Sequence, residues 1–343
     1  MEYWKEINKK LKPWVDTDLN KTVVDLFAGC GGLSLGFEAN GFKTIGYEMD
    51  ESATNTYNKN LIGECINKKL TVDTKYPKAE IVIGGPPCQP FSVGGKQLGL
   101  KDSRDGFPIF LAAIRQLDPE VLLFENVRGM LYKNEWYLKE VIEELESLGY
   151  YISYALLNAV NYEVPQNRER VIVIGSRQKI NLPRKVNRKV TAGQALGELA
   201  FQYDKDSKFF TESMDRYVEN YEKASKCINP RDLYLDRPAR TLTCRNLAGA
   251  TGDMHRVRLK DNRRRRITVR EAARLQSFPD WFEFSGTETN QYNQIGNAVA
   301  PNFAYHLALN IKNHLMGEAK NKYIITEHDQ LKLFENEALY QSR

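Results

Sequence analysis

The sequence predicts an α/β fold in which a doubly wound parallel sheet is followed by a smaller, loop-rich domain. Up to about residue 177, short β-branched or apolar runs alternate with helical stretches, as they do in a parallel sheet covered by helices. Residues 178–262 then contain few periodic segments and many turn signals. Helical periodicity returns near the C-terminal end of the chain. The predicted strands are 22–27, 43–47, 81–83, 121–125, 152–157 and 171–175.

Six helices are predicted, four between these strands and two after the loop-rich part. The last two are placed to pack back on the first domain. The predicted helices are 33–40, 52–60, 108–117, 137–148, 268–276 and 301–315. We divide the chain into an extension (1–20), a sheet domain (21–177), a loop-rich domain (178–265), a segment that bridges back (266–315) and a polar tail (316–343).

The composition, 42% hydrophobic and 27% charged residues, is ordinary for a globular chain of 343 residues. No apolar run reaches the length needed to span a membrane, and the first residues do not form a secretion signal. We therefore expect a cytoplasmic protein, and a monomer. The basic residues are concentrated in 231–270, which contains twelve Lys and Arg residues and four Asp residues. This part of the chain is therefore expected to contact a polyanion. The alternative is a solvated face or a targeting signal at 263–266.

The five cysteines are odd in number, form no Cys-x-x-Cys pair and are accompanied by only four histidines. This pattern argues against a disulfide framework and against a metal site. Cys88 differs from an ordinary core cysteine in its neighbours, Gly-Gly-Pro-Pro-Cys-Gln-Pro-Phe-Ser (84–92). Prolines on both sides hold it in a loop at the ligand-binding edge of the sheet. The following segment, 93–105, has three glycines and is expected to move as a lid.

A glycine-rich turn, Asp-Leu-Phe-Ala-Gly-Cys-Gly-Gly (25–32), joins the first predicted strand to the first helix. Such a turn lets the backbone approach a ligand closely. Tyr-Glu-Met-Asp (47–50), about twenty residues on, places a carboxylate where it can accept hydrogen bonds from ribose hydroxyls. Both NAD and S-adenosylmethionine carry a ribose. Asp25 and Phe27 suit capture of a charged amino-acid group and stacking better than they suit a pyrophosphate.

Several strings together resemble the motifs of DNA cytosine-5 methyltransferases of the bacterial restriction-modification type, which are Rossmann-like enzymes. The resemblance covers about residues 21–315, with the blocks in the family's order. The strings are 25–32, 84–92, Phe-Glu-Asn-Val (124–127), Gln-Asn-Arg-Glu-Arg-Val (166–171), Arg-Pro-Ala-Arg-Thr-Leu-Thr (237–243), 266–279 and 294–301.

The resemblance implies that the Cys88 thiolate adds to carbon 6 of cytosine, which makes carbon 5 nucleophilic. Glu125 would protonate or hydrogen-bond ring nitrogen 3. Arg168 and Arg170, expected on one face of a strand, would favour the thiolate, stabilise the Glu125 carboxylate and grip the target. Cys244, in a Thr-Cys pair, is a rival nucleophile, but its place in the basic region indicates a packing residue.

The resemblance also implies S-adenosylmethionine as the cofactor, with Phe27 stacked on adenine and Glu48 on the ribose. Asn297, with Gly296, is expected to form a turn that completes the pocket. The adenine amine has two candidate partners, Asn67 and Asp73. The expected cofactor contacts are Asp25, Phe27, Gly29, Gly31, Glu48, Met49, Asn67, Pro87, Asn297 and Val299.

The expected substrate is duplex DNA, with the target cytosine flipped out of the helix. Thr241 would touch the backbone near that base, and Arg240 and Arg245 would contact phosphates or guanines. Gln89 and Ser92, from the loop that carries the nucleophile, are further expected DNA contacts. The protein is then expected at the nucleoid, with a cognate restriction endonuclease as its usual partner. Two alternatives are a transfer-RNA methyltransferase on the same scaffold and a non-catalytic DNA-binding relative.

Overall fold

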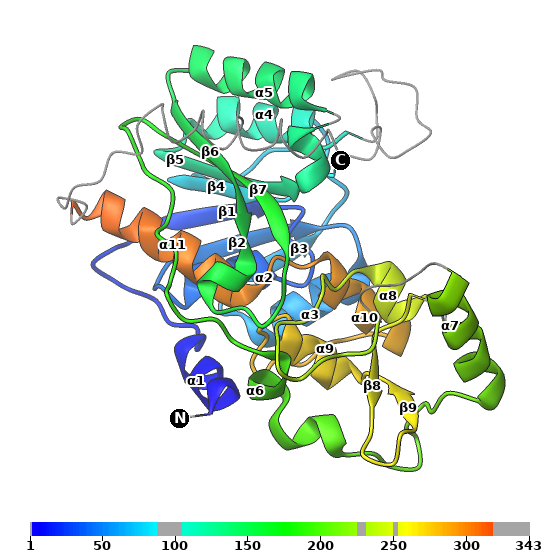
Figure 1. The fold of residues 1–343 in the computed structure, drawn as a ribbon. Coiled ribbons are helices and arrows are strands. Elements are labelled where there is room, and N and C mark those ends of the chain that lie inside the picture. The colour runs from blue at the N-terminus through cyan, green and yellow to red at the C-terminus, as the bar shows by residue number, and fades with distance from the viewer. Residues whose placement is uncertain (1, 88–104, 133, 225–230, 250–252, 318–343) are drawn as a thin grey trace.

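The computed structural model describes residues 2–87, 105–132, 134–224, 231–249 and 253–317. Figure 1 shows a layered part built on a central sheet and a smaller part with short helices and a two-stranded ribbon. The described residues form a seven-stranded sheet. Its order is β3 (Glu64–Asn67), β2 (Lys43–Glu48), β1 (Thr22–Leu26), β4 (Ile81–Gly84), β5 (Val121–Val127), β7 (Glu169–Ser176) and β6 (Tyr151–Asn158).

The expected parallel sheet is correct for β3, β2, β1, β4 and β5 and wrong for β7, which runs antiparallel to both of its neighbours. β6 and β7 are joined by the short helix η4 (Ala159–Tyr162) and a loop, and antiparallel neighbours need no crossover helix. β3 was not predicted from the sequence, because it lies at the edge of the sheet and buries only Cys65.

Helices cover both faces of the sheet. Alternate strand residues point to opposite faces. Val23 and Ile81 therefore lie in one core with α2 and α11, while Val24 and Val82 lie in another with α4 and α5. The predicted helices 52–60 and 108–117 agree with α3 and α4 to within one residue. These helices are α2 (Gly32–Glu38), α3 (Glu51–Asn60), α4 (Phe107–Leu117), α5 (Glu135–Ser147) and α11 (Pro301–Leu315), and η3 (Arg128–Leu131) follows β5.

The smaller part shares a core with the sheet part: Leu35 of α2 and Tyr57 of α3 pack with Leu242, Leu275 and Ile295. α9 and α10 therefore lie in this shared core, and α11 alone returns to the face of the sheet (Figure 1). The elements are α1 (Tyr3–Lys10), α6 (Ala192–Leu196), η5 (Gly197–Phe201), α7 (Glu212–Ala224), α8 (Cys244–Ala248), β8 (Arg256–Arg258), β9 (Arg264–Arg266), α9 (Val269–Leu275) and α10 (Glu288–Asn297).

α9 begins as its sequence predicts. The Thr268 hydroxyl accepts from the Glu271 N–H, and the Glu271 carboxylate accepts from the Thr268 N–H, which is a complete capping box. None of the helices in the described part of the chain combines the length and apolar character needed to cross a membrane.

Candidate active site

A cavity of about 880 Å³ opens at the carboxyl ends of β1, β2, β4 and β5. This is the edge at which doubly wound sheets bind their ligands. The far wall is formed by the end of α10 and the residues that follow it. The cavity brings together nine residues expected at the site: Asp25, Phe27, Gly29, Glu48, Met49, Pro87, Glu125, Asn297 and Val299.

The turn after β1 has unusual backbone geometry. Gly29 has φ +55°, which glycine adopts freely. Phe27 has φ +61°, which costs a residue with a side chain about 1–2 kcal/mol. Strain of this kind is concentrated at ligand sites, and the Phe27 side chain lines the cavity.

Gly31 does not line this cavity. Its φ is +88°, and a Cβ at this position would lie 2.7 Å from Cδ2 of Tyr57. The structure therefore gives a different reason for the glycine from the one the motif implied: the side chains of Tyr57 and Leu61 pack against this position, just before α2.

The Glu48 carboxylate is fixed at the end of β2 by three backbone donors. The N–H groups of Met49 and Asp50 donate to Oε1 at 2.8 Å each, and the Gly29 N–H donates to Oε2 at 2.9 Å. Glu48 therefore joins the glycine turn to the second strand. A carboxylate offers about four lone-pair sites, so these three donors leave acceptor capacity on Oε2 for a hydroxyl group in the cavity.

Asp25 is buried in the wall of the cavity, with 1% of its surface exposed. Its Oδ2 accepts from the Ser34 hydroxyl at 2.7 Å. Burial raises the pKa of the Asp25 carboxyl from 3.8 to about 7, and the nearby Glu48 charge adds to the rise. A cation next to this carboxylate would favour its ionised form.

Neither candidate for the adenine amine lines the cavity. The Asn67 carboxamide nitrogen donates to the Glu48 carbonyl at 3.2 Å and to the Thr54 hydroxyl at 3.1 Å, which holds the side chain between β2 and α3. Asp73 is also absent from the lining, which in this region consists of residues 68–70.

Gly296 and Asn297 are the last two residues of α10, so the expected turn is wrong: the helix continues to Asn297 and is capped by Ala298. The Cys244 thiol donates to Asn297 Oδ1 at 2.9 Å. A Cβ on Gly296 would lie 2.4 Å from the Cys244 nitrogen, so α8 and α10 are in close contact. Burial raises the pKa of the Cys244 thiol, as expected of a packing residue and not of a nucleophile.

Cys88, Gln89 and Ser92 lie outside the described residues, as does most of the segment expected to move as a lid. Pro87, the last described residue before this segment, and Asp105, the first one after it, both line the cavity. The Gly106 N–H donates to the Pro87 carbonyl at 3.0 Å.

Glu125 lies on the same cavity, near the end of β5. Its Oε1 is 2.6 Å from Nε of Arg170, and both side chains are nearly buried, 12% and 13% exposed. The pair comes from adjacent antiparallel strands. Asn126, next in the chain, donates from Nδ2 to the Pro86 carbonyl at 3.1 Å, which ties the end of β5 to the chain after β4.

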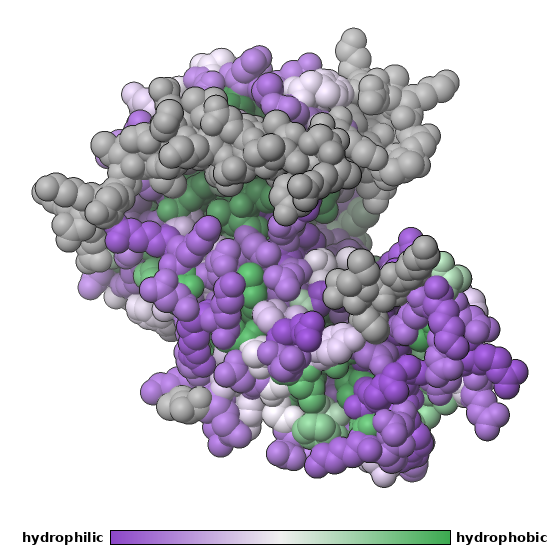
Figure 2. Space-filling model, in the orientation of Figure 1, coloured by the Kyte–Doolittle hydropathy of each residue, from purple (hydrophilic) through white to green (hydrophobic). Residues whose placement is uncertain are grey.

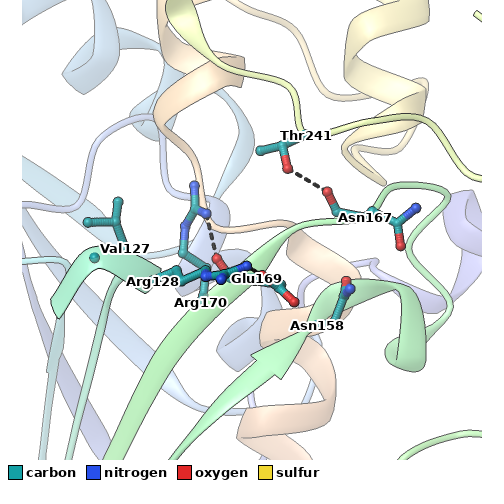
Figure 3. Close-up of a pocket in the computed structure, with 8 residues that line it drawn as sticks. Val127, Arg128, Asn158, Asn167, Glu169, Arg170 and Thr241 are labelled. Atoms are coloured by element: carbon teal, nitrogen blue, oxygen red, sulfur yellow. Dashed lines mark hydrogen bonds and ion pairs between the residues drawn. The ribbon is translucent and has the colours of Figure 1, made fainter. Parts of the chain in front are cut away.

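A second cavity, of about 480 Å³, adjoins the first, because Arg170 lines it while its partner Glu125 lines the other. Figure 3 shows the ends of β6 and β7 on one side and Thr241 on the other. The Thr241 hydroxyl donates to the Asn167 carbonyl at 2.6 Å. Asn158, Asn167 and Glu169 also line this cavity and were not singled out from the sequence. Asn167 and Glu169 lie within the motif at 166–171, but only its arginines were assigned a role, and Asn158 belongs to no motif.

Arg168 does not share a face with Arg170. It precedes β7, and only 2% of its surface is exposed. Its guanidinium donates to the carbonyls of Leu242, Gly296 and Ala298 at 2.8–3.1 Å. The expectation that it grips the target is therefore wrong, because its Nη atoms are bonded to backbone in the interior.

Three of the twelve basic residues in 231–270 are also turned inward. Arg256 and Arg264 are buried against the Asp232 carboxylate, and Arg265 against Glu271. The expectation that the whole segment faces a polyanion is wrong for these three. Figure 2 shows that hydrophilic side chains still cover the surface over α7 and the β8–β9 ribbon.

Two arginines expected at DNA share one carboxylate. Arg240 lies 3.2 Å and Arg245 3.7 Å from Asp253. Arg245 has 82% of its side chain exposed and Arg240 has 33%, so both remain accessible. Among the described residues, no three or more His, Cys, Asp or Glu side chains are grouped to hold a metal ion.

Comparison with known proteins decides the family. The model of the C-5 cytosine-specific DNA methylases matches residues 21–313. The chain belongs to this family. Type II methyltransferase M.AplI of Arthrospira platensis is 53% identical over 317 residues, which cover 91% of each chain. Type II methyltransferase M.FnuDI of Fusobacterium nucleatum is 33% identical, covering 88% of this methylase and 96% of the relative.

Solved structures share the fold of this methylase. The methyltransferase EhMeth of Entamoeba histolytica superposes with a TM-score of 0.67 at 19% identity, covering 88% of this chain and 99% of the other. The Dnmt2 methyltransferase of S. pombe gives 0.66 at 19% identity, covering 87% and 99%. The methylase thus has the mixed α/β methyltransferase fold that its sequence predicted.

Proposed function

We propose that this methylase transfers a methyl group from S-adenosylmethionine to carbon 5 of a flipped-out cytosine in a specific duplex DNA sequence. One observation carries the proposal. The glycine turn with Phe27 and Glu48 lines the same cavity as Glu125, which Arg170 holds from the neighbouring strand. A donor bound at the turn and a base bound at Glu125 would therefore meet.

The cavity fits S-adenosylmethionine better than it fits NAD. When bound, this cofactor supplies an electrophilic methyl group on a sulfonium. Glu48 presents its carboxylate to ribose hydroxyls, and the Phe27 ring offers a face for adenine. The cofactor's cationic amino-acid end would meet the buried carboxyl of Asp25, which a pyrophosphate would not match. Met49, Pro87, Asn297 and Val299 complete the walls.

Cys88 is proposed as the nucleophile. Its thiolate sulfur would form a bond to carbon 6 of cytosine, and the electron pair of the 5,6 double bond would make carbon 5 able to take the methyl group. Loss of the proton on carbon 5 then restores the double bond and releases the thiolate. The family's nucleophile motif surrounds this cysteine, and the described ends of its loop lie on the cavity.

Glu125 is proposed to hold a proton against ring nitrogen 3, which withdraws electrons from the ring as sulfur adds. Arg170 holds the Glu125 carboxylate from the neighbouring strand and faces the second cavity. We propose that the second cavity takes the DNA backbone beside the target nucleotide, with Thr241 at its rim. Arg240, Arg245, Gln89 and Ser92 are the further DNA contacts that we propose.

In this proposal residues 21–177 form the catalytic domain and 178–265 the target-recognition domain, with 266–315 joining them. The protein would act as a monomer at the nucleoid, alongside a restriction endonuclease for the same sequence. The ends, 1–20 and 316–343, have no proposed role in catalysis.

The test is transfer of labelled methyl groups from S-adenosylmethionine to a bacterial DNA duplex, with transfer RNA as the competing substrate. We expect label in DNA only, at one cytosine of a short recurring sequence when the methylated cytosines are mapped. Cys88→Ser should abolish transfer while the cofactor still binds. Preferential labelling of transfer RNA, or near-normal turnover of the Cys88→Ser variant, would overturn the proposal.

A further inference from the structure

Arg168 is a buried cation whose Nη atoms bind only backbone among the described residues. It is 2% exposed, Nη1 donates to the Leu242 carbonyl at 2.8 Å, and Nη2 donates to those of Gly296 and Ala298 at 3.1 and 3.0 Å. Its Nε has no partner among the described atoms. Burial lowers the pKa of the guanidinium to about 9. A charge kept in the interior at such a cost needs a reason.

The three carbonyls belong to the walls of two different cavities. Leu242 follows Thr241, which lines the smaller cavity proposed for the DNA backbone. Gly296 and Ala298 flank Asn297 on the cavity proposed for the cofactor. The guanidinium is a planar, rigid fork, so its two ends cannot move independently. A shift of the segment around Asn297 is therefore passed to Leu242 through one side chain.

A second link runs beside the first. The Leu242 N–H donates to Gln166 Oε1 at 2.8 Å, and the Gln166 amide donates to Gln276 Oε1. The Gln276 amide in turn donates to the Ala298 carbonyl at 2.8 Å. The same two backbone positions, Leu242 and Ala298, are thus joined twice by buried polar side chains.

We propose that Arg168 is a positioning residue that couples the two sites, so that a cofactor bound against residues 296–299 strengthens the binding of DNA at Thr241. The inference rests on the proposed function. Its physical basis is shared ordering. A ligand that fixes the segment around Asn297 also fixes Leu242 through Arg168. DNA binding then costs less conformational entropy, because the chain around Thr241 is already ordered. By linkage, DNA strengthens cofactor binding by the same factor.

The test measures this coupling directly. The Kd of a duplex that contains the mapped target sequence is determined with and without saturating S-adenosylhomocysteine, which cannot react. For the wild-type protein we expect the DNA Kd to fall about tenfold when S-adenosylhomocysteine is present, within the usual range of coupling between sites. In Arg168→Lys the factor should fall to about one to two, because a single ammonium cannot hold both walls in the geometry of the guanidinium. The Kd of S-adenosylhomocysteine alone should change less.

A matched control is Arg265→Lys. Arg265 is equally buried, 1% exposed, and donates to the Leu199 and Ala200 carbonyls and to Glu271, away from both cavities. The Arg265→Lys substitution should lower the melting temperature but leave the coupling factor at its wild-type value. If Arg168→Lys does not fold, Gln276→Met tests the parallel link and should reduce the factor.

An unchanged factor in a folded Arg168→Lys protein would overturn the inference, as would a wild-type factor of one. If Arg168→Lys fails to fold, an unchanged factor in Gln276→Met overturns it as well. Methyl transfer to DNA by the same wild-type preparation reports on the proposed function separately, so the two can fail independently.

Discussion

The buried carboxyl of Asp25 should make the stability of the protein depend on pH in an identifiable way. Burial raises its pKa from 3.8 to about 7, a difference of about 3 units, or about 4 kcal/mol at 1.36 kcal/mol per unit. Because the folded pKa is raised, the folded state holds a proton that the unfolded state has lost. The stabilisation is therefore fully present below pH 4, is lost progressively up to pH 7, and is gone above pH 7.

Asp25→Asn removes this titration while keeping an acceptor for the Ser34 hydroxyl. Free energies of unfolding from urea titrations of both proteins, without cofactor, should differ by about 1 kcal/mol at pH 4.5. At pH 8 the variant should be more stable by about 3–4 kcal/mol. Taking the difference between the two proteins removes the titration of all other groups.

Asp50→Asn provides a control of opposite sign. Asp50 caps α3, and hydrogen bonds from the Ser52 hydroxyl and the Ala53 N–H lower its pKa. Its stabilisation is therefore present above pH 4 and lost as the pH falls, so this variant should be the less stable one at pH 8. A difference between wild type and Asp25→Asn that stays constant from pH 4.5 to pH 8 would refute the reasoning about burial.

Three further outcomes follow from the site. The affinity for S-adenosylhomocysteine should rise between pH 5 and pH 7 in the wild type and stay flat in Asp25→Asn, as calorimetry at several pH values would show; parallel curves would remove Asp25 from the cofactor contacts. Glu125→Gln should slow methyl transfer about 10²–10⁴-fold with a DNA Kd within about threefold of wild type, and equal losses in both would count against a proton role. Gly31→Ala should lower the melting temperature through the Tyr57 ring, with a cofactor Kd close to wild type once folded.

The sequence predicted the sheet well where strands are buried on both faces. Residues 81–83 and 121–124 form continuous apolar runs because helices cover both sides of β4 and β5. The direction of β7 could not be predicted, since its apolar run is the same whichever way the strand lies. Edge strand β3 was missed because a strand with one buried residue has no detectable period.

The candidate site residues were predicted from motifs. The wrong predictions of arginine surroundings have a common cause. Arg168 and Arg170 stand two apart, which suggested one face of a strand. Because β7 begins at Glu169, Arg168 lies before the strand and turns into the interior instead. The burial of other arginines was not predicted for a similar reason. Arg256 donates to the carboxylates of Asp232 and Glu222, more than twenty residues away, and such pairs leave no local sequence pattern.

The central claim is that a cysteine thiolate adds to the ring of an extruded cytosine while a methyl donor is bound beside it. A duplex in which the target cytosine carries fluorine at carbon 5 tests it most directly, because fluorine cannot leave as a proton does and the adduct is trapped. We predict a covalent protein–DNA complex, stable to denaturation, that forms only with S-adenosylmethionine present and that maps to the peptide containing Cys88. Absence of this complex with a duplex whose unmodified form is methylated, or an adduct on Cys244, would contradict the claim.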